Sequence, residues 1–166
     1  FQVDERIAPA GDPARNWTAL SETLLESVLA AAHPMPVETG DLFEAAAHYA
    51  ATLASLAGTP PVLDLVHLGL GADGHTASLV PGDAVLRVSD RDVAVTAPYQ
   101  KHRRMTLTYP ILSRARRLLW IVAGADKREA LAKLLAGDAS IPAGRVRAAS
   151  MPVVAARAAA EGLAAP

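Results

Sequence analysis

The chain has 166 residues, of which 51% are hydrophobic and 20% charged, so it carries enough apolar material for one buried core. Its 16 basic and 17 acidic side chains give a net charge of -1, which argues against a protein that binds the nucleic-acid backbone. The lack of cysteine excludes disulfides, thiolate nucleophiles and cysteine-bound zinc. The longest apolar run, 118–123, is far shorter than the ~20 residues that span a bilayer. We expect a soluble, cytoplasmic protein without membrane or nucleic-acid partners.

The first quarter of the chain predicts the end of a strand followed by a helix. Residues 1–3 have the character of a strand end, and the chain opens with Phe rather than Met. We therefore expect that an N-terminal portion of the domain is missing. Apolar residues then recur every three or four positions over 13–32, which predicts a helix with Asp12 as N-cap and Pro13 in its first turn.

The rest of the chain alternates between helix and strand signals. Further helices are expected from the Asp41 cap to about Leu56, over 126–136 before Gly137, and in the alanine-rich end before Gly162. Apolar runs predict strands at 62–68, 93–97, 105–107, 118–122 and 153–154. The alternation predicts an α/β fold, in which a single domain over 1–166 has a mainly parallel sheet with helices on both faces.

A glycine-rich turn follows the first buried strand. Residues 69–74 match G-x-G-x-x-G, the fingerprint of dinucleotide-binding proteins. That fingerprint requires a long helix after the third glycine, whereas Pro81 follows within two turns. Ligands of open α/β proteins bind beyond the carboxyl ends of strands. The turn is therefore a candidate binding site, but for a ligand other than a dinucleotide. Gly71 and Gly74 allow backbone N–H groups to approach a ligand without obstruction by a Cβ.

His75 is the candidate for acid–base chemistry in this turn, because histidine exchanges protons readily near neutral pH. Asp73 could fix the tautomer of the His75 ring. The alternative is that both side chains only stabilise the turn and a short helix after it, in which Ser78 would lie. His67 is expected to be structural, and no histidine pair has the spacing of metal ligands, so we expect neither a metal nor an organic cofactor.

Basic residues at three distant positions suggest a site for a phosphate. Arg6 lies in the charged triplet 4–6, next to the predicted strand end, and can contact a phosphate through two N–H groups. Arg104 ends the basic run 101–104, a kind of cluster that is more often only a solvated face. Lys127 follows a strand and begins a helix, and a helix N-terminus with an added ammonium group suits an anion. Together they indicate a small phosphorylated substrate.

These residues resemble those of a known family, the 6-phosphogluconolactonases of the small α/β type, which share a fold with glucosamine-6-phosphate deaminases. The resemblance rests on 4–6 (DER), Asn16, 68–79 (LGLGADGHTASL), 104–108 (RMTLT) and 124–127 (GADK). It covers almost the whole chain and implies the NagB/RpiA/CoA-transferase-like fold. It also implies that the chain is the C-terminal two-thirds of the domain.

The resemblance implies hydrolysis of 6-phospho-D-glucono-1,5-lactone to 6-phosphogluconate in the oxidative pentose phosphate pathway, without a cofactor. His75 would be the general base, oriented by Asp73 or by Asp4. Backbone N–H groups around Gly71 and Gly74 would stabilise the oxyanion.

The phosphate of this substrate would be held by Arg6, Arg104 and Lys127. Ala156 departs from the family pattern, which tends to have an aspartate there. Two other functions stay open at this point: a deaminase-like sugar-phosphate isomerase and a non-catalytic sugar-phosphate binder. The segment after His75 lacks the glutamate of the deaminases, which favours the lactonase. The expected oligomeric state is a monomer or a weak homo-oligomer.

Overall fold

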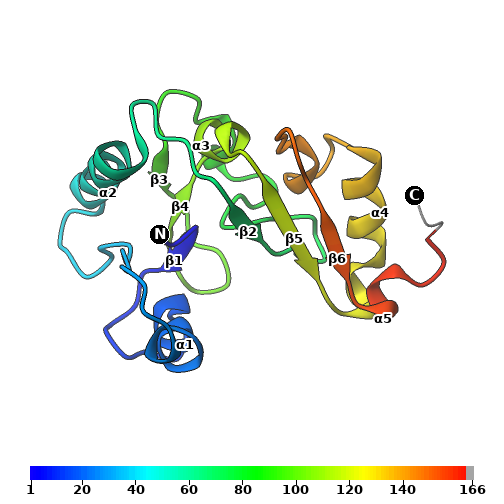
Figure 1. Ribbon diagram of the computed structural model, residues 1–166, viewed down its shortest axis with the longest axis horizontal. Helices are drawn as coiled ribbons and strands as arrows, with labels where there is room; N and C mark the ends of the chain where they lie inside the picture. Colours follow the sequence, from blue (N-terminus) through cyan, green and yellow to red (C-terminus); the bar gives the residue numbers. More distant parts are fainter. Residues whose placement is uncertain (164–166) are drawn as a thin grey trace.

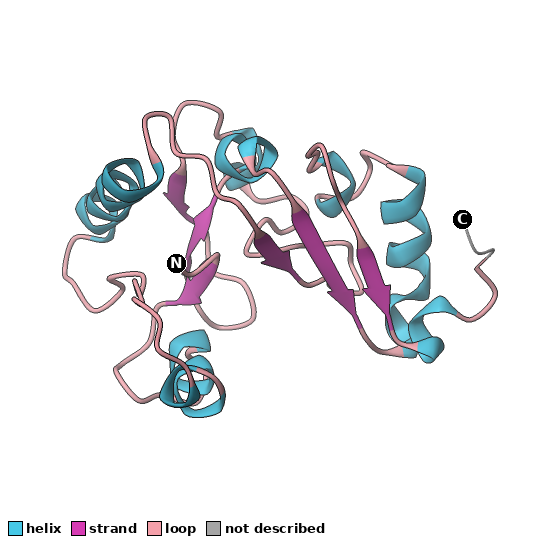
Figure 2. Ribbon diagram, viewed as in Figure 1, coloured by secondary structure: helices cyan, strands magenta, loops and turns pink. Residues whose placement is uncertain are grey.

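The computed structural model describes residues 1–163, and in this part of the chain six strands form two three-stranded sheets. One sheet is antiparallel, in the order β1-β4-β3, and the other is parallel, in the order β2-β5-β6. Figures 1 and 2 show the two sheets next to each other, with α1 and α2 on the side of the antiparallel sheet and α4 and α5 beyond β6. The α/β class is confirmed.

The parallel sheet consists of β2 (Val66–Leu68), β5 (Leu118–Val122) and β6 (Val153–Ala155). Leu68 pairs with Trp120, and Trp120 in turn pairs with Val153. Leu118 and Trp120 have no exposed surface, so β5 is the centre of this sheet and of the apolar core. The strands predicted from apolar runs are therefore confirmed here, although β2 begins four residues later than expected.

The antiparallel sheet consists of β1 (Asp4–Arg6), β4 (Arg104–Leu107) and β3 (Val93–Val95). A short connection joins β3 to β4, and such a connection allows only antiparallel pairing. The sequence analysis predicted β3 and β4 but not their antiparallel pairing. The expectation that 1–3 are a strand end is wrong, since the strand begins at Asp4, where the backbone starts to pair with β4.

The register of β1 on β4 determines which charged residues meet. Asp4 is opposite Thr106, and Arg6 is opposite Arg104. Side chains alternate between the two faces of a strand, so these four lie on one face and Glu5 lies on the other.

The helix α2 (Leu42–Ala57) matches its prediction closely and packs against β3. The Asp41 carboxylate accepts the N–H groups of Phe43 and Glu44, at 2.9 and 3.0 Å, which satisfies donors that the helix itself leaves free. Gly58 follows the last turn with a φ of +90°, a conformation that suits glycine.

The helix predicted over 13–32 is much shorter in the structure. It comprises α1 (Asn16–Thr23) and a 3-10 turn, Leu25–Ser27, after which the chain is irregular up to residue 36. Asp12 is not its N-cap, because the Asp12 carboxylate accepts the N–H of Ala14 in a turn before the helix.

The remaining helices are short and surround the two sheets. They are α3 (Tyr109–Arg114), which the sequence did not predict, α4 (Arg128–Ala136) and α5 (Arg157–Ala160). Three single 3-10 turns lie at Ala84–Arg87, Ala125–Lys127 and Ala143–Arg145. Gly137 ends α4 in the left-handed conformation, as predicted. None of the described helices combines the length and the apolar character needed to cross a membrane.

Candidate active site

The turn after β2 is held by its own backbone. The Gly71 N–H donates to the His75 carbonyl at 2.8 Å, and the Gly74 N–H donates to the Gly71 carbonyl at 3.0 Å. Each N–H has a single proton, so these two groups already have acceptors, which argues against their expected role as oxyanion donors. The chain continues in turns rather than in the short helix expected to contain Ser78.

His75 and Asp73 form the central pair of the turn. The His75 Nδ1 lies 2.6 Å from Asp73 Oδ1, and the same oxygen accepts the His75 backbone N–H at 3.1 Å. A Cβ on Gly71 would overlap the His75 ring, so glycine is required there for the ring to take this position. Burial acts to raise the pKa of Asp73, but the hydrogen bonds from His75 and Tyr99 lower it, so the carboxylate stays charged.

Asp4 lies apart from this pair. Its carboxylate accepts the Ser78 hydroxyl at 2.6 Å and the Asn16 side-chain amide at 3.2 Å. Burial raises the pKa of Asp4, although the Ser78 hydrogen bond and the charges of Arg6 and Arg104 act to lower it. Of the two carboxylates expected to orient His75, the structure therefore places Asp73 against the ring.

Arg6 and Arg104 face each other across the antiparallel pair β1–β4. Like charges in this arrangement repel. Burial first, and then the charge of Arg6, lowers the pKa of Arg104, which is only 4% exposed. Among the described residues, the buried Nε atoms of both arginines have no hydrogen-bond partner. Two partly unsatisfied guanidinium groups at one place suit a multiply charged anion.

A cavity of about 660 Å³ brings most of the predicted site residues together. Its lining includes His75, Gly71, Asp4, Arg6 and Lys127, which come from distant parts of the chain. The side chain of Lys127 is 24% exposed, and its ammonium nitrogen lies 2.9 Å from a carboxylate oxygen of the neighbouring Asp126.

Three of the predicted residues do not line this cavity. They are Asp73, Gly74 and Arg104. Asp73 contacts the ring of His75 from outside it, and Gly74 packs on Ile141. Arg104 lies opposite Arg6, which does line the cavity.

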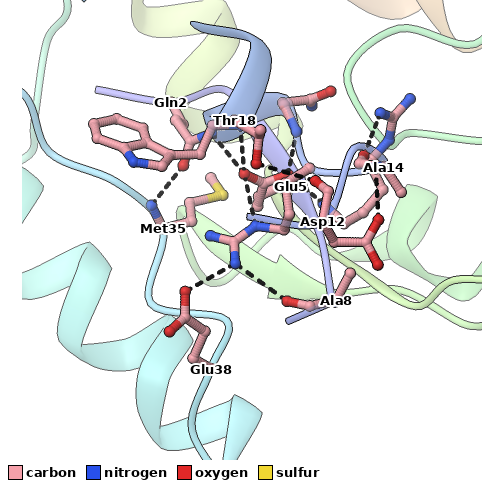
Figure 3. A network of polar contacts seen from close by, with 12 residues as sticks. Gln2, Glu5, Ala8, Asp12, Ala14, Thr18, Met35 and Glu38 are labelled. Carbon is pink, nitrogen blue, oxygen red and sulfur yellow. Dashed lines mark hydrogen bonds and ion pairs between the residues drawn. The ribbon is translucent and has the colours of Figure 1, made fainter. Parts of the chain in front are cut away.

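Glu5 is a supporting residue that the sequence analysis did not single out. Figure 3 shows its carboxylate at the centre of a polar network below α1. It accepts the backbone N–H groups of Asn16 and Trp17, both at 2.8 Å, and the Gln2 side-chain amide at 3.0 Å. Arg15 pairs with it at 3.1 Å.

This network fixes the start of α1 on β1, and with it the amide of Asn16 that contacts Asp4. The hydrogen bonds from Gln2, Trp17, Asn16 and Arg15 lower the pKa of Glu5 even though burial acts to raise it. Alternation within the triplet 4–6 could have indicated that Glu5 faces away from the site.

The other residues that the sequence analysis missed are Tyr99, which donates its hydroxyl to Asp73 at 3.2 Å, and Ser78 as the partner of Asp4. No motif or periodicity marks Tyr99. Within residues 1–163, no group of three or more His, Cys, Asp or Glu side chains is arranged to hold a metal ion.

The sequence and the fold are similar to those of known proteins. Residues 1–155 match the family model described as glucosamine-6-phosphate isomerases/6-phosphogluconolactonase. The chain is 38% identical over 146 residues to the 6-phosphogluconolactonase of Synechocystis sp., which covers 84% of this chain and 60% of that protein. It is 40% identical over 136 residues to the human GDH/6PGL endoplasmic bifunctional protein, covering 76% of this chain and 17% of that protein.

Among solved structures, the 6-phosphogluconolactonase of Trypanosoma brucei superposes with a TM-score of 0.84 at 28% identity. The superposition covers 99% of this chain and 73% of that one. The chain thus spans about 60% of the length of the Synechocystis relative and less of the human one. Since the family model extends over nearly the whole sequence, the chain belongs to the glucosamine-6-phosphate isomerase/6-phosphogluconolactonase family.

Proposed function

We propose that the protein hydrolyses 6-phospho-D-glucono-1,5-lactone to 6-phosphogluconate, a step of the oxidative pentose phosphate pathway, with His75 as the general base. The observation that carries this proposal is that His75, Arg6 and Lys127 line one and the same cavity, which offers a base and cations to one small molecule. The relatives from Synechocystis and Trypanosoma brucei are both named 6-phosphogluconolactonase, which supports the same reaction.

The Asp73–His75 pair suits activation of water. Because Nδ1 of His75 faces Asp73, Nε2 is the nitrogen that can accept a proton. Water transfers a proton to Nε2 while its oxygen attacks the lactone carbonyl carbon. The tetrahedral intermediate then expels the ring oxygen, which takes the proton back from Nε2. The negative charge of Asp73 stabilises the imidazolium formed between the two steps.

The substrate's phosphate would be held by Arg6, Arg104 and Lys127. A dianion between the two opposed arginines replaces their mutual repulsion with attraction. Anchoring the phosphate fixes the distance of the lactone carbonyl from His75, and positioning of this kind contributes strongly to catalysis. Gly71 contributes the space that the His75 ring occupies.

The test is proton release from freshly generated 6-phosphogluconolactone, compared for wild type and His75→Ala. We expect the variant to lose about a hundredfold or more of the enzymatic rate, the usual size of a general-base contribution. His48→Ala is the matched control, because it removes an exposed histidine of α2 that does not line the cavity. A His75→Ala variant that is as fast as wild type would overturn the assignment of the base.

Two further assays separate the alternatives. Ammonia release from glucosamine 6-phosphate would indicate a deaminase instead. Tight binding of 6-phosphogluconate in calorimetry, without any acceleration of lactone hydrolysis, would indicate a non-catalytic binder.

The location and the assembly state are also proposals. We propose a cytoplasmic protein that is a monomer or a weak homo-oligomer, and the absence of cysteine is compatible with a reducing compartment. Cell fractionation tests the first, and light scattering across a concentration series tests the second.

A further inference from the structure

Tyr99 lies between the Asp73–His75 pair and Arg104. Its hydroxyl donates to Asp73 Oδ2 at 3.2 Å, and its ring meets the His75 ring edge to face, with the centroids 5.7 Å apart. The guanidinium carbon of Arg104 lies 5.0 Å from the centroid of the same ring. One side chain therefore contacts the base, the carboxylate that orients the base, and a cation of the proposed phosphate site.

The turn between β3 and β4 holds Tyr99 in this place. Tyr99 and His102 exchange backbone hydrogen bonds of 2.9 and 3.3 Å across the turn. The two residues between them, Gln100 and Lys101, have φ values of +47° and +75°. Such values strain residues other than glycine, and strain of this kind is found where the position of a side chain matters.

The hydroxyl of Tyr99 completes the contacts of the Asp73 carboxylate. Oδ1 of Asp73 faces the ring and the backbone N–H of His75, and Oδ2 faces Tyr99. The Asp73 side chain is 39% exposed, so its own surroundings restrain it little. The hydrogen bond from Tyr99 is the contact through which the β3–β4 turn resists rotation of this carboxylate away from His75. Gln100 donates its side-chain amide to the Tyr99 oxygen at 3.3 Å, which leaves the phenol proton for Asp73.

The ring of Tyr99 supports Arg104. This arginine is buried and forms no ion pair with a carboxylate among the described residues. The face of an aromatic ring attracts a cation, and more strongly where water is excluded. The ring therefore partly compensates a charge that its neighbour Arg6 repels.

We propose that Tyr99 is a positioning residue that holds Asp73 against His75 through its hydroxyl and holds Arg104 in the phosphate site through its ring. The proposal rests on the roles of His75 and Arg104 in the proposed function. The proposal assigns two separate effects to one side chain. The hydroxyl orients the base through Asp73, and the ring positions Arg104 for binding of the anion.

Two substitutions test this separation. Tyr99→Phe removes only the hydroxyl, and we expect kcat to fall about tenfold with KM unchanged, since the base is affected and the cation is not. Tyr99→Leu also removes the ring, and we expect the same fall in kcat together with a rise in KM of about tenfold. Tyr109→Phe is the control, because it too loses one hydroxyl hydrogen bond, to the Pro142 carbonyl at 3.1 Å.

A measurement that needs no turnover completes the test. The proton on His75 Nδ1 is followed by NMR and assigned with His75→Ala. We expect the signal to broaden or disappear in Tyr99→Phe, because the mobile carboxylate of Asp73 no longer protects this proton from water, and to persist in Tyr109→Phe.

The outcomes are distinct. A Tyr99→Phe variant with wild-type kcat and an unchanged Nδ1 proton overturns the positioning role. A wild-type protein that does not accelerate lactone hydrolysis contradicts the proposed function instead. In that case the Nδ1 proton alone decides on Tyr99: loss of the signal in Tyr99→Phe supports the proposal and its persistence overturns it.

Discussion

The two sheets contribute to the site in different ways. The parallel sheet is apolar, with Leu118 and Trp120 fully buried, and it contributes through the segments that follow its strands: the turn after β2, and Lys127 after β5. The antiparallel sheet carries charges inside the protein: Glu5 is fully buried, Arg104 nearly so, and Arg6 lies opposite Arg104. The proposed base, His75, is therefore positioned by the turn at the end of a strand. The two arginines of the proposed anion site are brought together by the register in which β1 pairs with β4.

The two sheets also differ in how their buried side chains contribute to the stability of the fold. Buried apolar side chains stabilise the fold in proportion to the area they remove from water. Buried charges cost free energy unless a partner compensates them, so each one makes the antiparallel sheet sensitive to the loss of a single contact. We expect substitutions in the two sheets to differ in size and in their response to ligand and pH.

The largest effect is expected for Glu5→Ala. It leaves Arg15 without its fully buried partner and removes the acceptor of two N–H groups at the start of α1. We expect a loss of about 3–5 kcal/mol in the free energy of unfolding, measured with urea. Glu38→Ala is the control, since Glu38 pairs with the same arginine but is 55% exposed, and we expect a loss of at most about 1 kcal/mol. Equal losses in the two variants would contradict the comparison.

Leu118→Ala tests how much apolar packing in the parallel sheet contributes to the free energy of unfolding. We expect it to cost about 3 kcal/mol, from lost burial and from the cavity left in the centre of the parallel sheet. Leu118→Met keeps the volume, so we expect it to cost less than about 1.5 kcal/mol. If the two variants were equally destabilised, packing would not be the source of stability in this sheet.

A smaller effect concerns the opposed arginines. Inorganic phosphate should stabilise the wild-type protein, by about 2.7 kcal/mol at a hundred times its dissociation constant. In Arg104→Met we expect most of this gain to be lost, whereas stability without phosphate stays equal or rises, because the repulsion from Arg6 is removed. Thermal unfolding with and without phosphate provides the measurement. An Arg104→Met protein that phosphate stabilises as much as wild type would exclude this residue from the anion site.

The smallest effect is a difference in pH dependence between two adjacent residues. The pKa of Asp4 lies above its ordinary 3.8 in the folded protein, so its contribution to stability decreases as the pH rises above 3.8. The pKa of Glu5 lies below its ordinary 4.5, so its contribution is complete above 4.5 and is lost as the pH falls.

Unfolding of wild type, Asp4→Asn and Glu5→Gln between about pH 3 and about pH 6 tests this difference. As the pH rises, the stability of wild type relative to Asp4→Asn should fall, and its stability relative to Glu5→Gln should rise. Slopes of the same sign would show that the two faces of β1 are not as different as their contacts indicate.

Local patterns in the sequence predicted the parts of the fold that depend on local chemistry. Asp41 and Gly58 bound α2 as expected, because caps act on N–H and carbonyl groups within a few residues. The helix expected over 13–32 failed for the opposite reason. Its apolar residues had the right spacing, yet Val28 and Leu29 are exposed, and the buried network of Glu5 fixes the start of α1 at Asn16 instead.

The candidate site could be predicted only in part. His75 and Asp73 are two residues apart and meet within one turn, so the sequence contains their contact. The opposition of Arg6 and Arg104 depends on the pairing of strands almost a hundred residues apart, which no local pattern contains. Tyr99 reaches Asp73 only because of the strained turn after β3, and neither its spacing nor its type indicates this.

The missing side chain of Gly71 has a consequence for the proposed reaction. The Nδ1 and Cε1 atoms of the His75 ring occupy the place where a Cβ on Gly71 would lie, and the same Nδ1 contacts Asp73, so rotation of the ring would break this contact. In the proposed reaction, the proton that His75 takes from water would stay on Nε2 until it passes to the leaving ring oxygen of the lactone. The same lactone molecule that is attacked by the water would thus receive the proton. Glycine at position 71 leaves the space in which His75 takes the orientation needed for both proton transfers.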